Sequence, residues 1–217
     1  MKIATNTINV LKNFAKINPS IVIQEGNVLK TMSPSKTIMA KAKVETDFGQ
    51  RFAIYNLDRF ISTVSLFNDP DFTFTSRSVE ISSENRKTSY VYADESNITK
   101  APDREIALPS VDVSFTFTNE VLKDIEKACG VLSLPEIAVI GDGSTITINA
   151  IDSKLTAGDT YSVVIGQTDK AFKAIFKIEN IKIIPGDYEV TISSKGISHF
   201  SGKDAEYWIA VEQNSVF

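Results

Sequence analysis

The sequence is short of the residues that most often carry chemistry, because its 217 residues include one cysteine, one histidine and one tryptophan. A single cysteine excludes a disulfide framework and a multi-thiolate zinc site, and it is typical of a reducing compartment. No apolar stretch approaches the ~20 residues that a membrane-spanning helix needs, and the first residues lack the apolar core of a signal peptide. We therefore expect a soluble, intracellular protein with no membrane partner.

The charge balance and the missing motifs narrow the class further. Hydrophobic residues make up 42% and charged residues 23% of the chain, which is an ordinary globular composition. The 23 basic and 27 acidic residues give a net charge of −4. This argues mildly against a protein that binds nucleic acid on its outer surface. No glycine-rich loop ends in Gly-Lys-Ser/Thr, so no nucleotide phosphate site is predicted. We expect neither a cofactor nor a bound metal.

The single histidine and the single cysteine give no sign of an active site. His199 stands in Ser-His-Phe-Ser-Gly between two predicted strands, and the sequence shows no nucleophile or orienting carboxylate for it. We interpret it as a surface-loop histidine. Cys129 falls on the apolar face of a predicted helix and is interpreted as a buried, inert thiol. Acidic pairs such as Asp69 and Asp71 lie beside turn signals, where aspartate is expected. An enzyme is not expected.

The chain contains an internal repeat. Residues 11–17 resemble residues 122–128, at an offset of 122 − 11 = 111, about half of 217. A second similarity is between residues 69–74, which follow 52–57, and residues 185–190, which follow 176–181. It aligns Asp71 with Asp187, at an offset of 187 − 71 = 116. Two internal similarities in the same order and at nearly the same offset predict two copies of one unit.

The two copies meet in a proline-containing junction at about 96–112. Pro102 and Pro109 favour an extended path, whereas the apolar residues at 106–108 indicate that the junction packs back onto a unit. We place the domain boundary within this junction, with an N-terminal domain at 1–108 and a C-terminal domain at 109–217.

Each half is predicted to be a β-rich unit with two short helices. A helix at 6–17 is stopped by Asn18-Pro19, and its counterpart begins after Thr118 and ends at Gly130. A further helix is predicted at 56–67, and its second-half counterpart has room for a single turn only. An Asp-Gly pair at 142–143 predicts a hairpin. Strands are predicted at 20–24, 28–32, 37–46, 72–75, 79–83, 87–92, 137–140, 145–151, 159–165, 171–176, 188–193 and 206–211.

The two long helices carry a lysine pair at matching positions. Lys12 and Lys16 lie opposite the apolar face of the first helix, and Lys123 and Lys127 occupy the same angles on its counterpart. A single lysine pair is usually only a solvated helix surface. Its recurrence at equivalent positions suggests one elongated ligand with a phosphate backbone that both units contact in the same way.

The residues at 11–15, at 53–57 leading into Phe60, and at 65–69 form one part of a family resemblance. The other part is in the tail, at 185–188, 195–196, 200, 202, 205, 207 and 210–212. Together they resemble the sliding clamp, or DNA polymerase processivity factor, of T-even-type bacteriophages, in order and with similar spacing over nearly the whole chain. Residues 133–175 match in pattern only.

This resemblance implies an α+β fold with two units of the DNA-clamp type, whose helices line the channel of a homotrimeric ring around duplex DNA. It implies that the ring tethers the phage DNA polymerase for processive synthesis in the cytoplasm of the infected bacterial host. A separate ATP-dependent clamp loader is expected, since the chain has no nucleotide loop. The family also serves late transcription through sigma-like and coactivator proteins, of which the sequence itself carries no sign.

The resemblance also implies two sets of site residues. The predicted channel residues are Lys12, Lys16, Arg59, Lys123, Lys127 and Lys182. The predicted partner pocket lies beneath the junction at 96–112, which we call the connector, and comprises Met32, Ile38, Ile106, Leu108, Pro109, Tyr207, Trp208 and Val211. Ordinary core packing explains each of these residues equally well. The alternative reading is a ring-forming, β-rich phage structural protein that does not track DNA. It explains the strands and the acidity but not the repeated lysine pairs.

Overall fold

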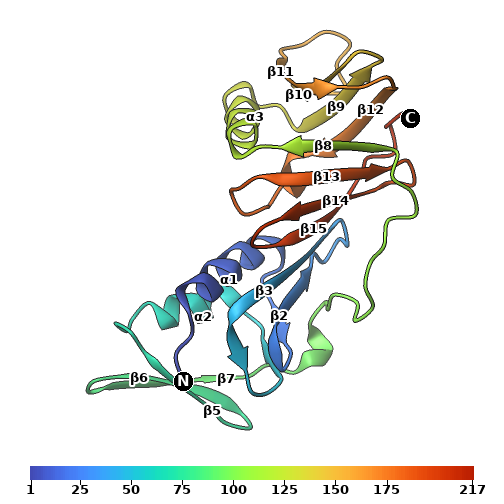
Figure 1. The fold of residues 1–217 in the computed structure, drawn as a ribbon. Coiled ribbons are helices and arrows are strands. Elements are labelled where there is room, and N and C mark those ends of the chain that lie inside the picture. Colours follow the sequence, from blue (N-terminus) through green and yellow to red (C-terminus); the bar gives the residue numbers. More distant parts are fainter. The chain divides into compact units, whose positions relative to one another are not determined.

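The computed structural model describes all 217 residues and divides them into two compact units, Met1–Asp103 and Arg104–Phe217 (Figure 1). The division falls inside the predicted junction, shortly before the predicted boundary at 108/109. Both units are rich in strands and hold few helices, which confirms the α+β fold class with two β-rich units.

Unit 1 combines two α-helices with three small groups of strands. Strands β1 and β4 pair, β2 pairs with β3, and β5, β6 and β7 form a three-stranded sheet. The elements are α1 (Thr5–Ile17), β1 (Ile21–Ile23), β2 (Gly26–Met32), β3 (Ile38–Phe48), β4 (Phe52–Ile54), α2 (Leu57–Val64), β5 (Asp71–Phe74), β6 (Ser78–Ser83), β7 (Arg86–Val91) and the short 3-10 helix η1 (Glu95–Asn97).

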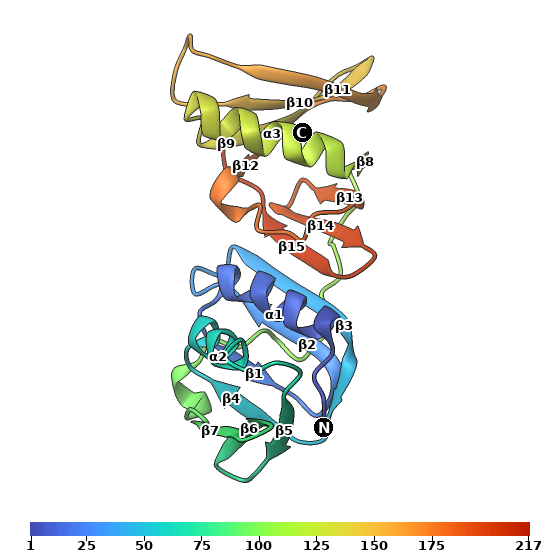
Figure 2. The same cartoon turned by 90° about the vertical axis from the view of Figure 1, so that its left-hand side faces the viewer.

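Helix α1 covers one face of the β2–β3 pair, and α2 lies beside α1 (Figure 2). The apolar face of α1 buries Leu11 and Phe14 completely, which is the face that the 3.6-residue periodicity predicts. The hydroxyls of Thr7 and Thr46 share a hydrogen bond of 2.9 Å and join the helix to β3. The helix ends at Ile17, as predicted from Asn18-Pro19, and the Asn18 N–H donates to the carbonyl of Phe14.

Unit 2 places a helix against a four-stranded sheet of order β11-β10-β9-β12, while β8, β13, β14 and β15 pair in succession. The helix α3 lies across β9 and β10 (Figure 2). The elements are β8 (Val113–Phe117), α3 (Asn119–Leu132), β9 (Glu136–Asp142), β10 (Thr145–Ile151), β11 (Tyr161–Gln167), β12 (Ala171–Lys177), the 3-10 helix η2 (Ile178–Asn180), β13 (Tyr188–Ser193), β14 (Ile197–Gly202) and β15 (Glu206–Ala210).

Several local predictions for unit 2 are confirmed. The side chain of Thr118 accepts a hydrogen bond from the Val121 N–H and is the N-cap of α3. The hairpin between β9 and β10 turns at Asp142 and Gly143, where the carboxylate of Asp142 accepts the N–H groups of Ser144 and Thr145. These hydrogen bonds lower the pKa of Asp142. The second-half counterpart of α2 is the single turn η2, as predicted.

The predicted end of α3 at Gly130 is wrong. The helix continues to Leu132, and the left-handed cap residue is Ser133 with φ of 55°. Gly130 is exposed and has ordinary helical backbone, because the buried Ala128 and Cys129 keep the last turn packed on the sheet. A glycine therefore stands in the helix interior rather than at its cap.

Two glycines of unit 2 give a matched prediction for stability. A Cβ at Gly141 would lie 2.6 Å from the Lys170 carbonyl oxygen and would also meet the Phe172 ring, whereas a Cβ at Gly130 would meet nothing within 4 Å. We expect Gly141→Ala to lower the free energy of unfolding by about 1–3 kcal/mol. Gly130→Ala should raise it by about 0.5–1 kcal/mol. Urea unfolding of both variants measures the difference, and equal midpoints for the two would contradict the described packing.

Candidate functional site

Two lysines of α1 lie on its solvent-exposed face. Lys12 and Lys16 are exposed, and so are Thr5 and Asn9 on the same stripe of the helix. The spacing of three and four residues places all four side chains on one side of α1, opposite the buried Phe14. The prediction that α1 presents a polar, basic face to solvent is therefore confirmed.

Helix α3 presents a more mixed face. Lys123 and Lys127 are exposed, as on α1, but Glu120, Asp124 and Glu126 are exposed beside them. The field of this helix is therefore weaker than that of α1. We call Lys12, Lys16, Lys123 and Lys127 the helix lysines.

The other two predicted channel residues, Arg59 and Lys182, differ in exposure. Arg59 is exposed on α2, where its own N–H donates to the side chain of Asn56 at the start of the helix. Lys182 follows η2, is half-buried and takes part in an interaction of its own. Lys182 therefore presents less free charge to a ligand than Arg59 does. Whether either residue contacts DNA stays a prediction.

Two of the predicted partner-pocket residues, Tyr207 and Trp208, lie on opposite faces of strand β15. Tyr207 is fully buried, its hydroxyl accepts the Ile184 N–H at 3.0 Å, and its ring centroid lies 5.9 Å from that of Tyr188. Burial raises the pKa of both tyrosines well above the ordinary value. Since consecutive strand residues point to opposite faces, Tyr207 and Trp208 do not line the same side of the sheet.

The remaining predicted pocket residues vary in exposure. Ile38 and Val211 are buried, at 2% and 7% exposed, and contribute to the cores of their own units. Met32, Ile106 and Leu108 are half-buried, and Pro109 is exposed. The three half-buried residues and the exposed Pro109 are the ones that a partner can reach. The pocket as a whole stays a prediction.

His199 is not in a surface loop, which corrects the interpretation from sequence. It lies in β14, its Nε2 is 3.0 Å from the carboxylate of Glu206, and its ring stacks on Trp208 with centroids 4.7 Å apart. The serines and the glycine around His199 obscure the alternating pattern of a strand. Ser198 occupies a buried position, where the pattern expects an apolar residue, and its hydroxyl donates to the Ile209 carbonyl. The imidazole thus has a carboxylate that orients it, but the group stacked on it is an indole, which cannot act as a nucleophile. These contacts do not form a catalytic triad.

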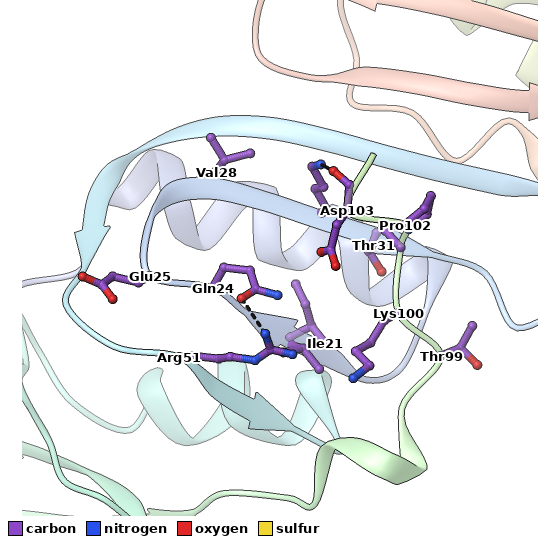
Figure 3. Close-up of a pocket in the computed structure, with 13 residues that line it drawn as sticks. Ile21, Gln24, Glu25, Val28, Thr31, Arg51, Thr99, Lys100, Pro102 and Asp103 are labelled. Carbon is purple, nitrogen blue, oxygen red and sulfur yellow. Dashed lines mark hydrogen bonds between the residues drawn. The ribbon is translucent and has the colours of Figure 1, made fainter. Parts of the chain in front are cut away.

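A pocket of about 250 Å³ lies along β2 in unit 1 (Figure 3). Its walls come from β1, β2, Arg51 and the connector residues 99–103. Ile21, Val28 and Pro102 give it an apolar side, and Lys30 and Lys100 give it a basic side. The hydroxyl of Thr31, which is 3% exposed, has no hydrogen-bond partner. Nothing in the sequence alone singles out this pocket, since its walls are far apart in the chain.

Polar contacts fix the connector over this pocket. The guanidinium of Arg51 forms two hydrogen bonds to the Glu95 carboxylate and a third, of 3.0 Å, to Gln24 (Figure 3). The Asn18 amide donates to the carbonyls of Met32 and Thr99. Hydrogen bonding to Arg51 lowers the pKa of Glu95, so this contact is present at neutral pH and is lost only as the carboxylate is protonated in acid.

Cys129 is buried at 4% exposed, as predicted, and burial raises the pKa of its thiol. No group of three or more histidine, cysteine, aspartate or glutamate side chains is placed to hold a metal ion. None of the helices combines the length and the apolar character that a bilayer span requires.

Comparison with known proteins identifies the family. Residues 2–103 match the family described as DNA polymerase processivity factor, and residues 114–213 match the gp45 sliding clamp, C terminal. The sliding clamp of Vibrio phage KVP40 is 34% identical over 98% of this chain and 99% of its own length. The chain belongs to the sliding-clamp family. The sliding clamp of Enterobacteria phage T4 is 29% identical over 99% of this clamp and 98% of its own length.

Solved structures show the same fold at low sequence identity. The PCNA of A. fulgidus, solved with the C-terminal region of FEN-1, has a TM-score of 0.70 at 13% identity, with 97% of each chain covered. A putative DNA polymerase III beta subunit from Eubacterium rectale has a TM-score of 0.71 at 14% identity, and it covers 100% of this clamp and 65% of its own chain. The predicted clamp fold is confirmed.

Proposed function

We propose that this sliding clamp encircles duplex DNA as a homotrimer and tethers the phage DNA polymerase for processive synthesis. The observation that supports this most is the exposure of the helix lysines at equivalent positions of α1 and α3, both offset by 111 residues, in a chain with a net charge of −4. Three subunits of two domains each, 1–108 and 109–217, would present six similar helices. Few, interchangeable phosphate contacts favour sliding over base readout.

Two sheet edges support self-association. Strand β7 ends the three-stranded sheet of unit 1, and β11 ends the four-stranded sheet of unit 2. Both present backbone groups without a sheet partner and exposed apolar side chains, with Val91 70% and Val164 66% exposed. Pairing of β7 on one subunit with β11 on the next is head-to-tail, and such an interface generates a ring when the rotation closes.

The clamp's protein partners are proposed from its family. Its sequence carries no Gly-Lys-Ser/Thr phosphate loop, so a separate ATP-dependent loader would open the ring on DNA. The polymerase would bind at the predicted pocket through the residues that a partner can reach, Met32, Ile106, Leu108 and Pro109, since the other four, Ile38, Tyr207, Trp208 and Val211, are buried. A sigma-like factor and a coactivator of late transcription would use the same clamp, in the cytoplasm of the infected bacterial host. The structural-protein alternative loses support, since both halves match clamp families.

Primer extension with the cognate polymerase and loader tests the proposal directly. On a primed circular template the clamp should increase product length, because a closed ring cannot leave a circle. On a linear template with open ends the increase should be largely lost, since the ring slides off. Blocking both ends of the linear template with a bound protein should restore it. Equal stimulation on circular and open linear templates would indicate ordinary binding and would contradict an encircling ring.

A further inference from the structure

The last residues of unit 2 lie along β12, which is the outer strand of the four-stranded sheet on the side away from β11 (Figure 1). The Lys173 N–H donates to the carbonyl of Val216 at 2.7 Å, and the Val216 N–H donates back to the carbonyl of Lys173 at 2.9 Å. The Ile175 N–H donates to the Ser215 hydroxyl at 2.9 Å, and the Ile175 carbonyl accepts the Glu212 N–H at 2.8 Å. This edge of the sheet is therefore already occupied.

The first residue of unit 1 covers an edge of the three-stranded sheet in a similar way. The N–H of Phe72, in the outer strand β5, donates to the Met1 carbonyl at 2.8 Å, and the Met1 amino group donates to the Phe72 carbonyl at 2.8 Å. The ammonium group of Lys2 forms ion pairs of 3.0 Å with Asp69 and 3.5 Å with Asp71, which hold Met1 beside β5. We call residues 1–2 and 212–216 the edge covers.

Each of the two sheets thus has one covered edge and one open edge. The covered edges are β5 and β12, and the open edges are β7 and β11. An open outer strand presents a row of unpaired N–H and C=O groups with which another chain can pair. The two open edges are the ones that the proposed ring contact uses.

Core packing does not explain the edge covers. Met1 is 46% exposed and Val216 is 64% exposed, so the side chains that lie over the edges bury little apolar surface. The contacts with β5 and β12 are made by backbone groups instead. A segment that binds a strand edge through its backbone, and leaves its apolar side chains in solvent, acts on the edge rather than on the core.

We propose that the edge covers direct self-association into a closed ring, because they prevent a second copy of this chain from pairing with β5 or β12. The inference rests on the proposed head-to-tail contact of β7 with β11. If β12 were open as well, β7 of another copy could add at either edge of the same sheet. A head-to-tail contact whose rotation does not close produces open chains instead of rings.

Strand lengths indicate that the cover on β12 has the larger effect. Strands β11 and β12 have seven residues each, so an uncovered β12 would offer β7 an edge as long as the intended one. Strand β5 has only four residues, which gives a second copy fewer backbone groups to pair with. Loss of the cover in unit 2 should therefore disturb assembly more than loss of the cover in unit 1.

Lifting the unit 2 cover in the full chain tests the proposal. In Ser215→Ala/Val216→Pro, the Ile175 N–H loses its side-chain acceptor, and residue 216 loses the N–H that donates to Lys173. Hydrogen exchange at the amides of Lys173 and Ile175 should become at least about tenfold faster. Light scattering at rising protein concentration should show species of at least about twice the wild-type mass. Adding Glu212→Pro removes the other N–H that reaches β12 and opens the edge further.

The same substitutions in a Val164→Lys background separate this inference from the ring contact. Val164→Lys blocks pairing at β11, and a lifted cover should still produce self-association, through β12. A trimer that survives Val164→Lys alone would contradict the contact of β7 with β11. The exchange and mass measurements at β12 do not depend on that result, so the two proposals fail separately.

Two matched variants serve as comparisons. Gln213→Ala changes an exposed residue of the same segment and should keep the wild-type mass and exchange rates. Lys2→Glu removes both ion pairs of the unit 1 cover and should increase self-association less than Ser215→Ala/Val216→Pro does, whereas Lys203→Glu, at an exposed residue of unit 2, should not increase it. Wild-type mass at every concentration, in a variant whose Lys173 and Ile175 amides exchange rapidly, would overturn the proposal.

Discussion

Charge reversal to glutamate at all four helix lysines should reduce processive synthesis to the level of the polymerase alone. Each chain then changes by 4 × 2 = 8 charge units, and the channel of the proposed trimer by 24. An exposed contact between unit charges contributes about 1 kcal/mol in water, so loss of roughly four simultaneous contacts amounts to about 4 kcal/mol, or nearly a 1000-fold weaker hold on DNA. Product length on a primed circle measures the effect.

The controls separate electrostatics from folding. Reversal at Lys195 and Lys203, both exposed in unit 2, should leave product length unchanged. Reversal of the α1 pair alone should cost more than reversal of the α3 pair, because Glu120, Asp124 and Glu126 already dilute the field of α3. Light scattering should still give the ring's mass for every variant. Unchanged processivity in the quadruple variant would show that these lysines do not face DNA.

Placing a lysine at either exposed sheet edge should dissociate the ring. In Val164→Lys and Val91→Lys, a charge replaces a valine that pairing of β7 with β11 would bury, and the loss of apolar burial alone is about 1.5–3 kcal/mol at each of three interfaces. The mass should fall from 3 × 23.9 = 71.7 kDa toward 23.9 kDa at micromolar concentration. Light scattering after size-exclusion chromatography provides the measurement.

Leu155→Lys is the matched control for the edge variants. Leu155 is 57% exposed in the loop between β10 and β11, so it undergoes the same change from apolar to charged away from the strand edge. It should keep the mass of the trimer. Circular dichroism of the dissociated variants should match wild type, since both valines are largely exposed within the single chain. A trimer mass for both edge variants would rule out pairing through β7 and β11.

The elements with clear periodicity were predictable from sequence. Helix α1 shows an apolar face at 3.6-residue spacing and a proline stop, and strands β10 and β13 have the bounds predicted for them. Strand β14 was missed because Ser198, a polar residue, takes an inward position where the pattern expects an apolar one. Strand β8 was also not predicted, although Val-Ser-Phe-Thr-Phe alternates cleanly. Strand β4, at 52–54, was not predicted either.

Site residues were predictable only where they share one element. Lys12 and Lys16 lie one helical turn apart, so spacing alone places them together. Residues on neighbouring strands are harder to place together, since Lys30 meets Lys41 only through the pairing of β2 with β3. The ion pair of Arg51 with Glu95 joins residues 44 positions apart and has no local signal. The contact of His199 with Trp208 likewise depends on the pairing of β14 with β15.

The stacking of the only imidazole on the only indole gives this clamp an intrinsic optical reporter. Trp208 is 5% exposed and lies within 4.7 Å of the His199 ring centroid, so its emission arises from one defined place in unit 2. Selective excitation of the indole avoids emission from the tyrosines. The fluorescence of Trp208 then reports on the β14–β15 pair without any attached dye. Opening, loading or partner binding that disturbs β14 and β15 becomes visible as a change in intrinsic fluorescence, in real time and on the unmodified protein.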